Sequence, residues 1–193
     1  DADDASAINS STGFITECAR SFWTTADTYW SFRPQGGCIG ANDASNSPDG
    51  NVVEKGAQAQ RLRSTTTRNL KTCTTSTFAC TGGLQNFNNS YVTQANLGAA
   101  STAERDALIN WQRGLDVADE NVNAATTTEM RASAHGDVVH SRPVAINYGT
   151  DVAPQVVVFY SGNDGVLRAI NGNRTTNIGS VPAGNEMWSF VAP

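Results

Sequence analysis

The two histidines of the chain stand close to an aspartate and a serine, which are residue types found in hydrolase triads and metal sites. They are His135 and His140, with Asp137 and Ser141 beside them. On an extended segment the odd separations place His140 on the face opposite both Asp137 and Ser141. The sequence has neither a G-x-S-x-G nor an H-E-x-x-H motif. We therefore interpret these residues as structural hydrogen-bonding groups and predict no catalytic residue.

Three segments are rich in the carboxylate and amide oxygens that calcium prefers as ligands. They are residues 1–4, 42–51 and 116–123. None has the D-x-D-x-D-G spacing of a calcium-binding loop, and turn or cap chemistry also explains such clusters. We predict no metal ligand and no cofactor-binding residue in this chain.

Four cysteines stand in two local pairs, Cys18 with Cys38 and Cys73 with Cys80. Their even number, the absence of C-x-x-C and the absence of a nearby histidine favour disulfides over zinc. Four cysteines allow three connectivities, and we expect the sequential one because short loops close readily. Disulfides indicate an oxidising compartment, namely the periplasm, the cell surface or the medium. Four buried free thiols in a cytosolic protein are the alternative.

Composition and charge argue against two kinds of partner. The 193 residues carry a net charge of −5, which repels nucleic-acid phosphates, and no basic and aromatic stripe is present. The one basic cluster, Arg61, Arg63, Arg68 and Lys71, is interpreted as a solvated face. No run approaches the ~20 apolar residues needed to span a bilayer. We expect no nucleic acid partner and no membrane span.

The C-terminal third has the strand pattern that would position these side chains. Four runs with strand character cover residues 137–146, 155–161, 166–171 and 186–191. The second and third are joined by Gly-Asn-Asp-Gly, whose residues tolerate the positive φ of a tight hairpin turn. Four short antiparallel strands in sequence are typical of one β-propeller blade. The alternative is a self-contained β-sandwich in which these strands pair with others upstream.

The predicted fold class is mainly β: a quinoprotein-like β-propeller fragment, preceded by a loop-rich α+β lead-in with two disulfides. Residues 1–128 form the lead-in, and residues 129–193 form the first blade. A blade presents apolar side chains on both faces and buries them only against neighbouring blades. We therefore expect the chain to belong to a longer propeller protein.

Two short helices are predicted in the lead-in. The first covers about residues 52–63, with Asn51 as N-cap and Glu54 as its capping-box partner. The second covers about residues 102–114, between a Ser-x-x-Glu capping box and Gly114. Its apolar stripe is expected to dock on the sheet: Ala107, Leu108, Trp111 and Leu115. One or two short strands are expected around the pair Cys73 and Cys80.

Residues 169–173 and 184–188, AINGN and GNEMW, resemble the blade signature A-x-D/N-x-x-x-G-x-E-x-W of quinoprotein-type propellers. Ten residues, 174–183, interrupt the pattern and predict an enlarged loop. The signature ends in Trp188, whose large ring on the last strand would cover the neighbouring blade. We therefore predict a structural role in blade docking for Trp188, and no cofactor role.

In longer stretches the chain resembles the PilY family of type IV pilus tip-associated proteins. These are HGDVVHSRPVAINYG, VVVFYSGNDGVLRAINGN and GNEMWSFVAP. In addition, SPDGNVVEKGAQAQRLR and INWQRG are similar to segments just upstream of the propeller in that family. The resemblance covers roughly residues 25–193.

The resemblance implies a large secreted bacterial protein with a variable N-terminal region, often carrying a von Willebrand A-like domain, and a C-terminal propeller. It implies a non-enzymatic role in pilus biogenesis with minor pilins, at the pilus tip, in adhesion to host or abiotic surfaces and in twitching motility. Such a protein reaches the cell surface through the periplasm. The family's calcium loop and Arg-Gly-Asp element have no counterpart here, since Leu115 follows Arg113 and Gly114. Calcium is therefore expected, if anywhere, in other parts of the parent protein.

Two other classes of function stay open. A PQQ-type quinoprotein dehydrogenase would use a similar propeller, but it would need about eight blades and a cofactor site with a metal. An extracellular ligand-binding β-domain is the third class. The absorption of a bound quinone would identify the first alternative. Labelling on intact cells away from pilus ends would favour the second.

Overall fold

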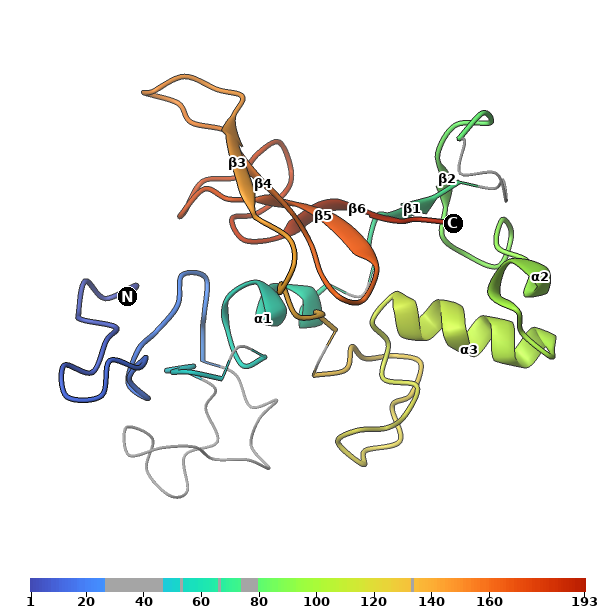
Figure 1. Cartoon of the computed structure of the whole chain (residues 1–193), viewed down its shortest axis with the longest axis horizontal. Coiled ribbons are helices and arrows are strands. Elements are labelled where there is room, and N and C mark those ends of the chain that lie inside the picture. Colours follow the sequence, from blue (N-terminus) through green and yellow to red (C-terminus); the bar gives the residue numbers. More distant parts are fainter. Residues whose placement is uncertain (27–46, 53, 66, 74–79, 133) are drawn as a thin grey trace.

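The structure is a computed structural model that describes residues 1–26, 47–52, 54–65, 67–73, 80–132 and 134–193. Its central feature is one six-stranded mixed sheet with the strand order β2-β1-β6-β5-β4-β3. The helices α1 and α3 lie on one side of this sheet (Figure 1). The predicted mainly β class is confirmed at this level. None of the helices in the described ranges is long and apolar enough to cross a membrane.

Four strands of the C-terminal third form the antiparallel part of the sheet. They are β3 (Val144–Asn147), β4 (Val156–Ser161), β5 (Val166–Asn171) and β6 (Glu186–Val191). The last three agree with the predicted runs to within one residue, and each pairs with its sequence neighbour. This agreement follows from local signals, because short connections bring consecutive strands together.

The predicted start of the first run, at residue 137, is wrong, since regular pairing begins only at Val144. Pro143 has no N–H to donate to the ladder. The Ser141 hydroxyl instead accepts a hydrogen bond from the Ser161 N–H at 3.0 Å. Because residues 137–143 are not a regular strand, strict alternation of faces does not apply to them.

Two short strands from the lead-in extend the sheet beyond β6. β1 (Leu70–Thr72) runs parallel to β6, and β2 (Gln85–Asn86) pairs antiparallel with β1. The predicted short strands on either side of Cys73 and Cys80 are thus confirmed. Strands from both predicted parts of the chain therefore belong to one sheet.

The connection between β1 and β2 is closed by the predicted disulfide between Cys73 and Cys80, whose Cα atoms are 5.1 Å apart. Cys18 is also disulfide-bonded. Its predicted partner, Cys38, lies outside the described residues. One of the two expected disulfides is therefore confirmed as paired.

The β4–β5 hairpin has the expected connection of four residues, 162–165. Its glycine Gly165 has φ +73°, and its N–H donates to the Gly162 carbonyl at 3.2 Å. The β5–β6 connection is the predicted enlarged loop, with an isolated bridge between Ile178 and Val181. The fully buried Asn171 orders this loop, since its Nδ2 donates to the Val181 carbonyl at 2.9 Å. Side-chain hydrogen bonds thus replace a tight turn at this end.

Helix α1 (Ala57–Arg63) begins later than predicted, and the capping box of Asn51 and Glu54 is wrong. The N-cap is Gly56, which offers no side chain for capping. The Thr24 hydroxyl caps the helix instead, accepting from the Ala57 N–H at 2.7 Å. A residue 33 positions away in sequence therefore fixes where α1 starts.

Helix α3 (Thr102–Gln112) confirms the second predicted helix. At its start the Ser101 hydroxyl accepts from the Glu104 N–H at 3.1 Å, and Glu104 accepts from the Ala100 N–H at 2.7 Å. At its end Gly114 has φ +96°, as the predicted C-terminal cap requires. A one-turn helix that the sequence reading missed, α2 (Gln94–Leu97), precedes α3.

The predicted docking stripe of α3 is wrong. Leu108 and Trp111 are 40% and 42% exposed, and Ile109 is the residue that packs into the core. The core cluster around it comprises Leu70, Phe87, Val92 and Val166. Gln112 donates to the Asp164 carbonyl at 2.9 Å. This hydrogen bond at the end of α3 helps to set how the helix is rotated about its axis. The spacing of apolar residues alone does not predict it.

The two faces of the sheet differ in what covers them. One face packs on the helices and buries Tyr160, Val166 and Arg168. The opposite face follows the pairing row from Val144 through Phe159 and Ala169 to Trp188. We call it the open face, because, apart from the buried Val157, most of its large apolar side chains are half-buried or exposed: Val144, Ile146, Phe159, Leu167, Trp188 and Phe190.

Candidate functional site

Trp188 lies at the centre of the open face. Its ring is 6.0 Å from the Phe159 ring, centroid to centroid, with the planes tilted by 50°. The two rings belong to a shallow hollow of about 460 Å³, lined also by Tyr148, Gln155, Val157, Ile178 and Met187. The hollow is formed by β4, β6 and the β3–β4 and β5–β6 connections beside them. It presents aromatic and aliphatic surface toward the side away from α1 and α3.

A β-bulge separates Trp188 from Glu186 across the sheet. In a regular strand two residues at this spacing would share one face. The β5–β6 register shifts between Ala169, which pairs with Trp188, and Ile170, which pairs with Glu186. Trp188 therefore lies on the open face, whereas the Glu186 carboxylate points to the buried face and its arginines.

The buried face holds a network of charged side chains. Arg68 donates to both carboxylate oxygens of Glu186, at 3.0 and 2.7 Å, and these side chains are 1% and 2% exposed. Arg168, whose side chain is fully buried, pairs with Asp164 and lies 3.9 Å from Glu186. Burial alone would raise the pKa of Asp164, but the hydrogen bond and charge of Arg168 hold it below its usual value. The predicted solvated face is thus wrong for Arg68, and also for Arg63, which is buried and donates to the Lys55 carbonyl at 2.6 Å.

Arg68 and a further arginine, Arg131, hold the C-terminal end of α3. Arg68 donates to the carbonyl of Arg113 at 3.1 Å, and Arg131 donates to the carbonyl of Trp111. Cations are favourable here because the last carbonyls of a helix lack partners within the helix. Through Glu186 this capping ties α3 to β6. The network therefore fixes how the lead-in sits on the sheet.

His135 belongs to a second buried chain of hydrogen bonds. Its Nε2 lies 2.7 Å from the Tyr160 hydroxyl, which donates to the Gln58 amide oxygen at 3.2 Å. Burial, followed by the positive charge of Arg168, lowers the pKa of His135 to about 4. Burial also raises the pKa of Tyr160. Both groups are therefore neutral at pH 7, and they join the loop before β3 to β4 and α1.

The other residues considered for chemistry have separate surroundings. Ser141 binds the β4 backbone, and His140 and Asp137 are exposed. His135 is the one among them that is held in a buried network. The structural hydrogen bonding predicted for this group is therefore found for His135 and Ser141.

The first and third segments considered for calcium have carboxylates that accept hydrogen bonds in local turns. Asp1 accepts from the Ala5 N–H at 3.0 Å, and Asp116 accepts from the Glu120 N–H at 2.9 Å. Residues 42–46 of the second segment lie outside the described residues. Over the ranges that the structure describes, no group of three or more His, Cys, Asp or Glu residues is placed to hold a metal ion.

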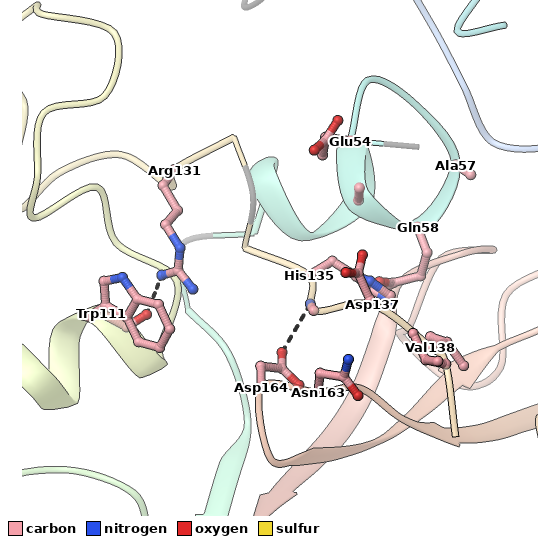
Figure 2. A pocket seen from close by; sticks show the side chains of 13 residues that line it. Glu54, Ala57, Gln58, Trp111, Arg131, His135, Asp137, Val138, Asn163 and Asp164 are labelled. Carbon is pink, nitrogen blue, oxygen red and sulfur yellow. Dashed lines mark hydrogen bonds between the residues drawn. The ribbon is translucent and has the colours of Figure 1, made fainter. Parts of the chain in front are cut away.

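An acidic pocket of about 820 Å³ lies between α1, the end of α3, residues 131–139 and the β4–β5 turn (Figure 2). Glu54 and Asp137 line it, and neither carboxylate has a hydrogen-bond or ion-pair partner among the described residues. Asp164 also lines the pocket, but Arg168 neutralises its charge. Among the described lining residues, Glu54 and Asp137 are therefore the two carboxylates without a partner.

The sequence analysis did not identify most residues of the buried charged network and of the acidic pocket. The sequence pattern around Arg168, however, indicated that this arginine is buried. Arg168 alternates with Val166 and Ile170, which places an arginine on the apolar side of a strand. A charge on a buried face needs a paired counter-charge. Its partners Asp164 and Glu186 were nevertheless not identifiable, because the bulge and the fold determine where they point.

Comparisons with protein-family models, with curated proteins and with solved structures find no match for this chain. The motifs, the open face and the acidic pocket are therefore the features from which a function can be argued.

Proposed function

We propose that this chain is a non-catalytic part of a type IV pilus tip protein. In this role it acts with minor pilins in pilus biogenesis and in attachment to host or abiotic surfaces. The stretches that resemble the PilY family support the proposal, because two of them form β4, β5 and β6. The disulfide between Cys73 and Cys80 supports export through the periplasm to the cell surface.

The open face is the observation that carries the proposal. Four consecutive antiparallel strands have one face packed on the lead-in and the other lined by large apolar side chains. Extensive exposed apolar surface usually marks an interaction site. In a β-propeller each blade buries such a face against the next blade. We propose that β3 to β6 are the first blade and that Trp188 packs against the blade that follows.

Hydroxyl-radical footprinting of the full-length protein tests this packing. Trp188 is expected to be strongly protected from oxidation, because a following blade would cover its ring. Trp111, which is 42% exposed, is the matched control and is expected to be modified readily. Mass spectrometry of tryptic peptides measures both residues in one sample. Equal modification of the two tryptophans would remove the support for a blade.

Deletion of the gene in its own bacterium tests the proposed role. We expect loss of most surface pili, counted by electron microscopy, and loss of twitching on agar, both restored by the intact gene. An epitope-tagged copy is expected to be labelled at pilus ends. Normal piliation of the deletion strain, or label spread evenly over the cell body, would contradict a pilus-tip role.

A further inference from the structure

We infer that the acidic pocket binds a lysine or arginine side chain presented by a protein partner. The pocket lies on the helix-covered side of the sheet, whereas Trp188 lies on the open face. The inference rests on the proposed function for one point, namely that the partner is a protein. That the ligand is a basic side chain is inferred from the charge and the shape of the pocket.

The charges around the pocket favour a cation. Glu54, just before α1, and Asp137, on the loop before β3, are both unpaired among the described residues and face the same cavity. Among the described lining residues the one arginine is Arg131, whose guanidinium donates to the Trp111 carbonyl and lies 4.1 Å from the Trp111 ring centroid. Neither carboxylate has a counter-charge among the described residues, and a cation in the cavity would supply one.

The size and the lining of the pocket favour an organic cation over a metal ion. A calcium ion needs six to eight oxygens at about 2.4 Å, which a cavity of about 820 Å³ with two free carboxylates does not provide. Its wall also contains apolar side chains from Ala57, Ala59 and Val138. The aliphatic stem of lysine or arginine packs on such surface while its charged head reaches a carboxylate.

Ligand-observed NMR titration of the full-length protein tests the inference. The probes are heptapeptides, acetylated and amidated, of sequence Gly-Ser-Gly-X-Gly-Ser-Gly with X as Arg, Lys or Gln. At low salt we expect the Arg and Lys peptides to bind about tenfold more tightly than the Gln peptide, as for two partly screened charge contacts. The double variant Glu54→Gln/Asp137→Asn is expected to lose this preference.

A second double variant separates the pocket from the overall negative charge. Asp4→Asn/Asp151→Asn removes the same two charges from exposed positions outside the pocket, where neither carboxylate is paired. It is expected to keep the preference for Arg and Lys. Equal binding of all three peptides by the unmodified protein would overturn the inference, and so would equal behaviour of the two double variants. Because piliation is measured separately, failure of the pocket and failure of the proposed function are distinguishable.

Discussion

Replacing Glu186 with glutamine is expected to lower the free energy of unfolding by about 3 kcal/mol. The substitution keeps the size of the side chain but removes the negative charge between Arg68 and Arg168. The Arg68 side chain is essentially inaccessible to water, so solvation cannot replace its lost partner, whereas Arg168 keeps its pair with Asp164. Chemical denaturation of the purified variant and of the unmodified protein measures the difference.

Two further variants establish that burial is the cause. Asp106→Asn breaks the ion pair between Asp106 and Arg105. Because the Asp106 side chain is 41% exposed, the substitution is expected to lower the free energy of unfolding by less than about 1 kcal/mol. Arg68→Met combined with Glu186→Met removes both charges of the bidentate pair and is expected to recover much of the stability lost in Glu186→Gln. A loss for Glu186→Gln as small as that for Asp106→Asn would contradict the role given to this network.

Protonation of His135 is expected to destabilise the protein as the pH falls from about 6.5 to about 4. The folded protein holds this histidine neutral down to a pKa of about 4, whereas its ordinary value is 6.5. Between these values the unfolded chain binds the proton more readily, so stability is complete above pH 6.5 and is lost as the pH falls. At about 1.4 kcal/mol for each pH unit, the loss reaches roughly 3 kcal/mol.

Stability measured against pH in two variants isolates this effect from the titration of carboxylates. His135→Gln is expected to flatten the pH dependence between 6.5 and 4, because the titrating group is gone. His140→Gln removes an exposed histidine and is expected to leave the dependence unchanged. The same slope in His135→Gln and in the unmodified protein would show that burial of His135 does not couple folding to pH.

Elements that depend on near neighbours were predictable from the sequence. β4 and β5 are joined by a four-residue connection whose Gly165 adopts positive φ, and their apolar residues mark both strands. Helix α3 carries its own start signal at Ser101 and its own stop signal at Gly114. In each of these cases the deciding contacts lie within a few residues, so the local sequence contains them.

Elements that depend on distant partners were predicted incorrectly or missed. The start of α1 is set by Thr24, which caps a helix 33 residues later. The rotation of α3 is set by anchors such as Gln112, which binds a carbonyl 52 residues away. Neither partner is marked by any periodicity in the sequence, because the same residue types are also common in solvated loops.

The consecutive strands and the Cys73–Cys80 pairing could be predicted from the amino-acid order, because hairpin turns and short loops bring together residues that are already near one another in the chain. The direction of Glu186, which turns inward to meet Arg68 118 residues away while Trp188 turns outward, could not. Nor could the position of Glu54 and Asp137 in one pocket. A register shift and the packing of the lead-in set these directions, and both depend on the whole folded chain.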